Sequence, residues 1–132
     1  MPEIIEGRNI DILSDGTPTR TFCYIADAIT GYFKVLLYPK LEAFNIGIDK
    51  PEISVKEFSE LFLKHGREIW NYKGEIKFNK SEDKAYMADN PNRRCPDITK
   101  ARKLLNYNPS IYVDKGIGRY LKFLKTYNGK LL

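Results

Sequence analysis

Hydrophobic residues recur along the chain at two spacings, one typical of strands and the other of helices. Short runs rich in β-branched and aromatic residues predict strands at residues 9–13, 19–25, 43–46 and 75–78. Apolar residues three or four positions apart predict helices that begin near Asp27, Ser54, Asp97 and Val113. This order of short strands and about four helices predicts a mixed α/β fold.

The second predicted helix has the clearest beginning. Ser54 and Glu57 have the spacing of a capping box, in which each side chain accepts a hydrogen bond from the backbone of the other residue. His65 precedes Gly66, and we expect it near the end of this helix with a structural role.

The first predicted helix extends from Asp27 to Pro39 and has one apolar face. Gly31 lies in its middle and weakens it by roughly 1 kcal/mol relative to alanine. The apolar face consists of Ile29, Tyr32, Phe33, Leu36 and Leu37.

Composition indicates one globular domain and excludes some classes of protein. The chain has 132 residues, of which 42% are hydrophobic, and its net charge is +5. Its lysines are scattered, which is typical of a solvated surface and not of a nucleic-acid-binding run. No apolar run is long enough to cross a membrane. Residues 1–6 lack a basic region and an apolar core, so we expect no secretory signal and a cytoplasmic location.

The two cysteines, Cys23 and Cys95, lie far apart in the sequence. They form no metal-binding spacing and no disulfide framework, so reduced thiols are expected. The sequence leaves open whether they meet in the fold.

A polar loop at residues 79–96 contains two adjacent arginines, Arg93 and Arg94, shortly before the helix that begins near Asp97. Guanidinium groups offer several fixed donors to phosphate or carboxylate, so the pair suits an anionic ligand. A solvated basic loop is the alternative. Asp97 itself is expected to cap the helix.

Three blocks carry a resemblance to a known family, and they occur in the family's order: residues 15–27, residues 44–47 followed by 53–57, and residues 93–109. They resemble the C-terminal portion of extended short-chain dehydrogenase/reductases that act on nucleotide sugars. This group includes UDP-glucuronate decarboxylase, dTDP-glucose 4,6-dehydratase and UDP-glucose 4-epimerase. The resemblance implies that residues 1–132 form a single partial domain that binds a nucleotide sugar, a UDP- or dTDP-sugar.

The resemblance also implies NAD as the cofactor of the parent family, but not of this chain. The chain has no Gly-x-Gly-x-x-Gly sequence, and no tyrosine is followed by a lysine four residues later. The cofactor-binding half of such an enzyme is therefore missing. We expect the chain to be inactive by itself and to have that half as a partner.

The resemblance assigns candidate binding residues. Arg20 and Arg94 match arginines that contact the substrate diphosphate, and Arg93 is a weaker candidate. Asn90 takes the place of an acidic residue that accepts from ribose hydroxyls. An ion pair with Asp27 is the structural alternative for Arg20. Asp97 and Asn45 match the family as well, and we interpret both as structural.

Two further hypotheses stay open beside the enzyme portion. One is a stand-alone, non-catalytic module that binds a nucleotide or a protein, and the weaker one is a basic nucleic-acid binder. Apolar side chains that the missing half would bury, among them Ile29, Phe33, Phe44 and Ile46, are expected to lie bare and to drive self-association into a homo-oligomer.

Overall fold

A computed structural model describes residues 2–79 and 91–127. These residues form five helices and five short strands, which confirms the predicted α/β class. The helices are α1 (Pro2–Glu6), α2 (Ile25–Leu36), α3 (Val55–Trp70), α5 (Thr99–Leu105) and α6 (Val113–Thr126). The strands are β1 (Ile10–Ile12), β2 (Thr19–Arg20), β3 (Ile53–Ser54), β4 (Ile76–Phe78) and β5 (Arg93–Arg94).

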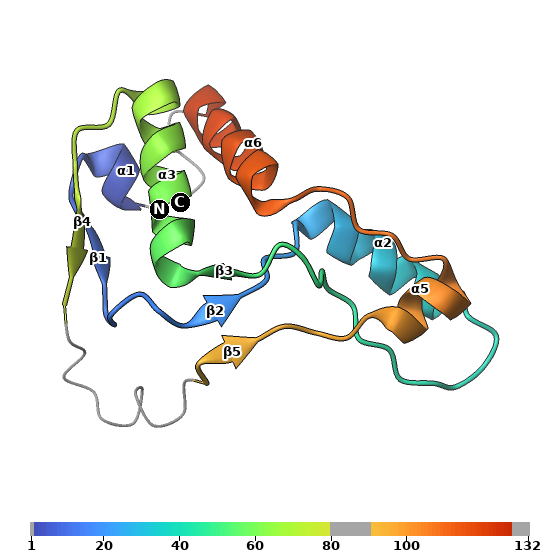
Figure 1. The fold of residues 1–132 in the computed structure, drawn as a ribbon. Helices are drawn as coiled ribbons and strands as arrows, with labels where there is room; N and C mark the ends of the chain where they lie inside the picture. Colours follow the sequence, from blue (N-terminus) through green and yellow to red (C-terminus); the bar gives the residue numbers. More distant parts are fainter. Residues whose placement is uncertain (1, 80–90, 128–132) are drawn as a thin grey trace.

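The strands form two small sheets (Figure 1). In one sheet β1 lies parallel to β4, with Ile10 opposite Ile76. In the other the order is β3-β2-β5, with β2 antiparallel to β3 and parallel to β5. The predicted strand at residues 19–25 is confirmed only at Thr19–Arg20; residues 21–24 have no regular structure, and α2 begins at Ile25.

Helices α3 and α6 pack against each other and form most of the larger hydrophobic core. Ser54 begins α3 with the predicted capping box, since its hydroxyl accepts from the Glu57 N–H while the Glu57 carboxylate accepts from the Ser54 N–H. The helix ends at Trp70, beyond His65, so the expected end near His65 is wrong. Gly66 is buried inside the helix, where Ile4 and Tyr72 lie close to it.

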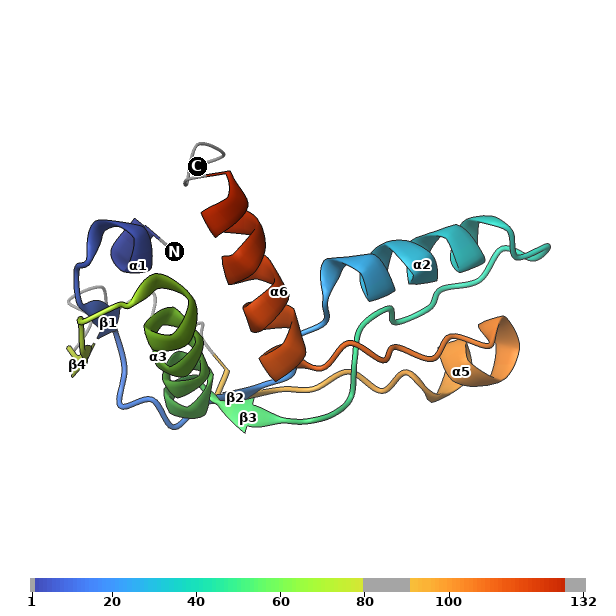
Figure 2. The same ribbon diagram turned by 90° about the horizontal axis from the view of Figure 1, so that it is seen from above.

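Helices α2 and α5 lie side by side and extend away from the α3–α6 pair (Figure 2). Between them lies a second, smaller core of Ile98, Ala101, Leu105 and Tyr107. Gly31 is buried at the inner side of α2, where a Cβ would lie 2.4 Å from Ile46 Cγ2 and 2.9 Å from Tyr107 Cε2. Only glycine allows the helix to approach these side chains so closely.

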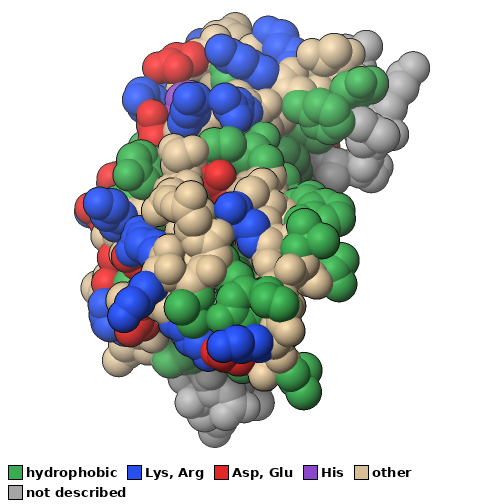
Figure 3. Space-filling view, turned by 90° about the vertical axis from the view of Figure 1, so that its right-hand side faces the viewer, with side chains coloured by type: hydrophobic (Ala, Val, Ile, Leu, Met, Phe, Trp, Pro, Cys, Tyr) green, Lys and Arg blue, Asp and Glu red, His purple; other side chains and the backbone are tan. Residues whose placement is uncertain are grey.

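The outer face of α2 is apolar and open to solvent. Phe33 is 60% exposed and Leu36 76% exposed, and their neighbours Ile25, Ile29, Tyr32 and Leu37 are exposed as well. Figure 3 looks at this end of the molecule and shows hydrophobic side chains gathered along one side of it. The apolar face predicted from the sequence exists, but it points outward. Phe44 and Ile46, which were expected to lie bare with it, are half-buried against the smaller core.

Residues 43–46 do not form the predicted strand. In the part of the chain that the structure describes, this segment has no strand pairing, and side chains hold it in place. The Asn45 amide donates to the carbonyl of Asp97 at 3.0 Å, and Ile46 packs against Gly31. A run of apolar residues indicates burial, whereas a strand also requires a neighbouring strand that the local sequence does not reveal.

Candidate functional site: an arginine pair on neighbouring strands

The parallel pairing of β2 and β5 brings together two arginines that lie far apart in the sequence. Arg20 is opposite Arg94 in the register of the two strands. Side chains of residues opposite each other in a parallel pair leave the sheet on the same side, so both guanidinium groups belong to one face. Arg94 is exposed and Arg20 is half-buried, with its Nη1 donating to the Thr19 carbonyl at 2.7 Å.

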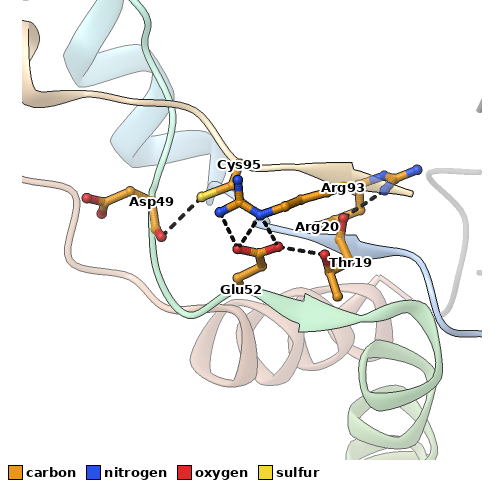
Figure 4. A network of polar contacts seen from close by, with 6 residues as sticks. All are labelled: Thr19, Arg20, Asp49, Glu52, Arg93 and Cys95. Carbon is orange, nitrogen blue, oxygen red and sulfur yellow. Dashed lines mark hydrogen bonds and ion pairs between the residues drawn. The ribbon is translucent and has the colours of Figure 1, made fainter. Parts of the chain in front are cut away.

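The neighbouring residues of the same two strands occupy the opposite face. Thr19 is opposite Arg93 there, and both side chains bind the carboxylate of Glu52 (Figure 4). The hydrogen bonds from Arg93, and next that from Thr19, hold the pKa of Glu52 below its ordinary value. In the same view the guanidinium of Arg20 points away from Glu52. The sheet therefore has one face with an arginine pair and another with a closed polar network.

A cavity of about 550 Å³ adjoins this sheet, which is a size that accommodates a small ligand. Its lining includes both arginines of β5 and both cysteines, together with Thr21, Ile46, Gly47, Ile48 and Pro96. Cys23 and Cys95 are free thiols, and both line this cavity. Burial raises the pKa of Cys23 above its ordinary value, so its thiol is less readily ionised.

The residues expected to be structural have structural contacts. Asp97 is not the N-cap of α5, as was expected: that position is Ile98, which makes no side-chain cap hydrogen bond. The Asp97 carboxylate, one residue earlier, accepts from the backbone N–H of Thr99 at 2.8 Å. The Asp27 carboxylate accepts from the backbone N–H groups of Ser110 and Ile111, at 3.0 and 2.8 Å. Asp27 therefore anchors the segment that leads into α6.

His65 also has a structural place. Its Nε2 lies 3.0 Å from an Asp114 carboxylate oxygen, so the contact connects α3 with α6. Gly118 lies against the imidazole ring, where a Cβ would be 3.1 Å from His65 Cε1. This position supports the expected structural role of His65.

Of the four candidate binding residues, the structure brings Arg20 and Arg94 together on one face. It gives Arg93 a bidentate partner in Glu52, and Asn90 lies outside the described residues. Glu52 was not singled out from the sequence, because its partner Arg93 is 41 positions away and no local pattern connects them.

Within residues 2–79 and 91–127, no group of three His, Cys, Asp or Glu side chains is placed to hold a metal ion, and no helix combines the length and apolarity needed to cross a membrane.

Comparison with known proteins shows which proteins this chain resembles. The model of the NAD-dependent epimerase/dehydratase family matches residues 2–47. The chain is 33% identical to UDP-glucuronate 4-epimerase of Thermodesulfobacterium geofontis, a match that covers 92% of the chain and 35% of that protein. It is 29% identical to UDP-glucuronic acid decarboxylase 5 of Arabidopsis thaliana, over 87% of the chain and 31% of that protein.

Solved structures agree with the sequence comparison. UDP-glucuronic acid 4-epimerase of Bacillus cereus, in complex with UDP-glucuronic acid and NAD, superposes with a TM-score of 0.74 at 28% identity, over 95% of this chain and 38% of that one. This chain therefore resembles a part of the length of proteins in the NAD-dependent epimerase/dehydratase family. The resemblance to extended short-chain dehydrogenases that the sequence predicted is thereby confirmed. An epimerase of Methanothermobacter thermautotrophicus shares the fold with a TM-score of 0.82, over 98% of this chain and 36% of that one.

The match covers only part of the family's length. The chain spans about a third of the curated relatives with which it aligns. The comparisons therefore establish the fold of this portion. The activities and substrates in the relatives' names belong to proteins about three times as long as this chain.

Proposed function

We propose that this chain binds the diphosphate of a nucleotide sugar, as the substrate-binding portion of an NAD-dependent sugar epimerase, dehydratase or decarboxylase. The register of β2 and β5 carries the proposal, because it puts Arg20 and Arg94 on the same face of one sheet. Guanidinium groups offer forked donors to phosphate oxygens, so two arginines on adjacent strands suit two linked phosphates. Arg94, but not Arg20, also lines the adjoining cavity.

We infer that the described residues form no dinucleotide-binding turn. A dinucleotide needs a glycine-rich turn between a strand and a helix, which lets the helix N-terminus approach the pyrophosphate. No glycine lies in the residues that lead into α2 (Thr21–Tyr24) or into α5 (Cys95–Ile98), and α3 follows its capping residue Ser54 directly. We therefore assign this chain the binding and orientation of the sugar nucleotide and no cofactor chemistry.

The exposed apolar face of α2 supports the proposal that another protein binds there. Exposed apolar surface of this kind marks an interaction site, and the family members that the chain matches have about two further thirds of sequence. The proposed partner is the cofactor-binding half of the same class of enzyme. Without that half, the same face is expected to associate two copies of this chain.

Calorimetry with UDP and uridine tests the arginine pair. Two charge-assisted contacts should make UDP bind more tightly than uridine by about one to three decades in affinity. Arg20→Ala and Arg94→Ala should each weaken UDP binding about tenfold and leave uridine binding unchanged. Arg67→Ala removes an exposed arginine from α3 and is the matched control. Equal affinity for UDP and uridine would refute the proposal.

An activity assay tests the division of labour. The purified chain, mixed with UDP-glucuronic acid and NAD, should form neither NADH nor a new sugar nucleotide. Conversion of the sugar by the chain alone, followed by nuclear magnetic resonance, would show that the catalytic groups reside in these 132 residues after all.

A further inference from the structure

The strand that carries Arg94 has few backbone contacts to hold it. Strand β5 is two residues long and lies at the edge of its sheet. Its flanking backbone bonds run from the Thr19 N–H to the Asn92 carbonyl at 2.8 Å and from the Thr21 N–H to the Arg94 carbonyl at 3.2 Å. So short a pairing does little to specify register by itself, because register normally depends on many pairs along a strand.

One carboxylate adds the missing constraint. Glu52 directly precedes β3, which lies on the far side of β2 from β5. Its oxygens accept from Thr19 Oγ1 at 2.6 Å, from Arg93 Nε at 2.9 and 3.1 Å, and from Arg93 Nη2 at 2.8 Å. A single side chain next to β3 therefore connects both β2 and β5, as Figure 4 shows.

The geometry of this contact distinguishes it from an ordinary surface ion pair. Isolated exposed pairs contribute little, because water competes and two long side chains lose freedom. Here the pairing is bidentate, and Thr19 donates a further hydrogen bond to the same carboxylate. The Cys95 thiol adds a neighbouring link by donating to the Asp49 carbonyl at 3.4 Å.

The contact also determines where Arg94 points. Successive side chains of a strand leave it on opposite faces, so fixing Arg93 on the Glu52 face puts Arg94 on the other face, beside Arg20. We infer that Glu52 is a positioning residue: by holding Arg93 it keeps Arg94 in register with Arg20 for a diphosphate. This inference rests on the proposed function of the arginine pair.

A competing role for Arg93 predicts the opposite result. If Arg93 bound the diphosphate directly, Glu52 would compete with the ligand, and removing its charge would strengthen UDP binding. If Glu52 is a positioning residue, the same change weakens binding because Arg94 is no longer held in place. The sign of the Glu52→Gln effect therefore separates the two roles.

The decisive measurement is calorimetry of UDP with Glu52→Gln, whose amide keeps the shape of the carboxylate but loses its charge. We expect UDP affinity to fall about three- to tenfold, because a small displacement of a charged ligand-binding group costs that much or more. Uridine affinity should not change. Glu42→Gln is the matched control, since Glu42 is paired with Lys100 at 2.8 Å, away from the Glu52 network. Unchanged or tighter UDP binding by Glu52→Gln overturns the inference.

A double-mutant cycle shows whether Glu52 acts through Arg94. In an Arg94→Ala background, Glu52→Gln should cause no further loss of UDP affinity, because the group that it positions is gone. A full additional loss in that background would mean that Glu52 acts on the fold or the ligand by another route, and would overturn the inference.

Hydrogen exchange tests the positioning without any ligand. The Thr21 N–H donates to the Arg94 carbonyl, so its exchange rate reports on the attachment of β5 to β2. Glu52→Gln should accelerate it several-fold, whereas Arg94→Ala should not. If UDP and uridine bind equally but this acceleration is seen, the proposed function fails while the positioning of β5 stands. If Arg94→Ala weakens UDP binding but Glu52→Gln alters neither binding nor exchange, only the positioning role fails.

Discussion

Helices α6 and α2 both carry an apolar stripe, and only α6 buries its stripe within the described structure. Val113, Ile117, Leu121 and Leu124 of α6 are all less than 8% exposed, whereas every large apolar residue on the outer face of α2 is at least 45% exposed. Both stripes have the spacing of a helix packed on one side. Periodicity therefore shows that a face is made for packing but does not show what covers it. In α2 it points to a partner outside the described part of this chain.

The largest contrast should appear in the free energy of unfolding. Leu121→Ala removes a fully buried side chain from the α3–α6 core and should cost about 3 kcal/mol. Phe33→Ala removes a larger but mostly exposed side chain from α2 and should cost less than about 1 kcal/mol. Urea denaturation of the two variants measures both values. Similar losses would mean that the outer face of α2 is packed in solution.

Self-association should depend on α2 and not on α6. A glutamate at Phe33 puts a charge into the apolar face and should raise the dissociation constant of a dimer at least about tenfold, because burying one such side chain contributes roughly 1.5–3 kcal/mol. Phe123→Glu is the control, since Phe123 is 48% exposed on α6. Sedimentation velocity measures the effect. Dimers that persist in Phe33→Glu and dissociate in Phe123→Glu would show that α6, and not α2, forms the dimer contact.

Helix α3 should be sensitive to loss of its N-terminal cap, whereas α2 has no side-chain cap to lose. Helix α3 has a capping box, whereas the N-cap of α2, Tyr24, makes no side-chain cap bond. Ser54→Ala should therefore lower the free energy of unfolding by about 1 kcal/mol. Ser110→Ala, an exposed serine in the segment between α5 and α6, should lower it much less. Thermal denaturation of both variants is sufficient to compare them.

The smallest expected effect is a pH dependence at the α3–α6 contact. The hydrogen bond from His65, and then the charge of Lys64, hold the pKa of Asp114 below its ordinary value of 3.8. A carboxyl whose pKa is lowered on folding stabilises the protein above its ordinary pKa and loses that contribution as the pH falls through the folded value. Because Asp114 is half-exposed, the contribution should be only about 0.5 kcal/mol.

Asp114→Asn should remove this contribution. Denaturation at pH 7 and at pH 3 measures how far the free energy of unfolding of the variant falls below that of the unchanged protein. This loss should be larger at pH 7 than at pH 3. A loss of equal size at both values would contradict the assignment to the ionised carboxylate.

Local patterns predicted what local interactions determine. The capping box at Ser54, the apolar stripe of α6 and the strands β1 and β4 all follow from residues near one another in the sequence, and the structure confirms them. Residues 43–46 were predicted as a strand because they are apolar, but pairing depends on distant segments. Helix α1 was missed because its five residues have too short a pattern to show a period.

In the candidate site, too, the sequence predicted single residues but not how distant residues meet. Arg20 and Arg94 were found because each lies in a block that resembles the family, yet no block reveals that they stand opposite each other. That fact is a property of register between strands far apart in the sequence. Glu52 was missed for the same reason, since its significance depends on Thr19 and Arg93 meeting at one carboxylate.

Gly31 determines the rotation of α2 about its own axis. Because there is no room for a Cβ between the helix, Ile46 and Tyr107, only one angular orientation lets α2 approach this closely. Turning the helix would bring a larger side chain to that point and push it away from the smaller core. A glycine that is unfavourable for helix formation thus decides which residues α2 presents to a partner, and Gly31→Ala would change the direction of that face while strengthening the helix itself.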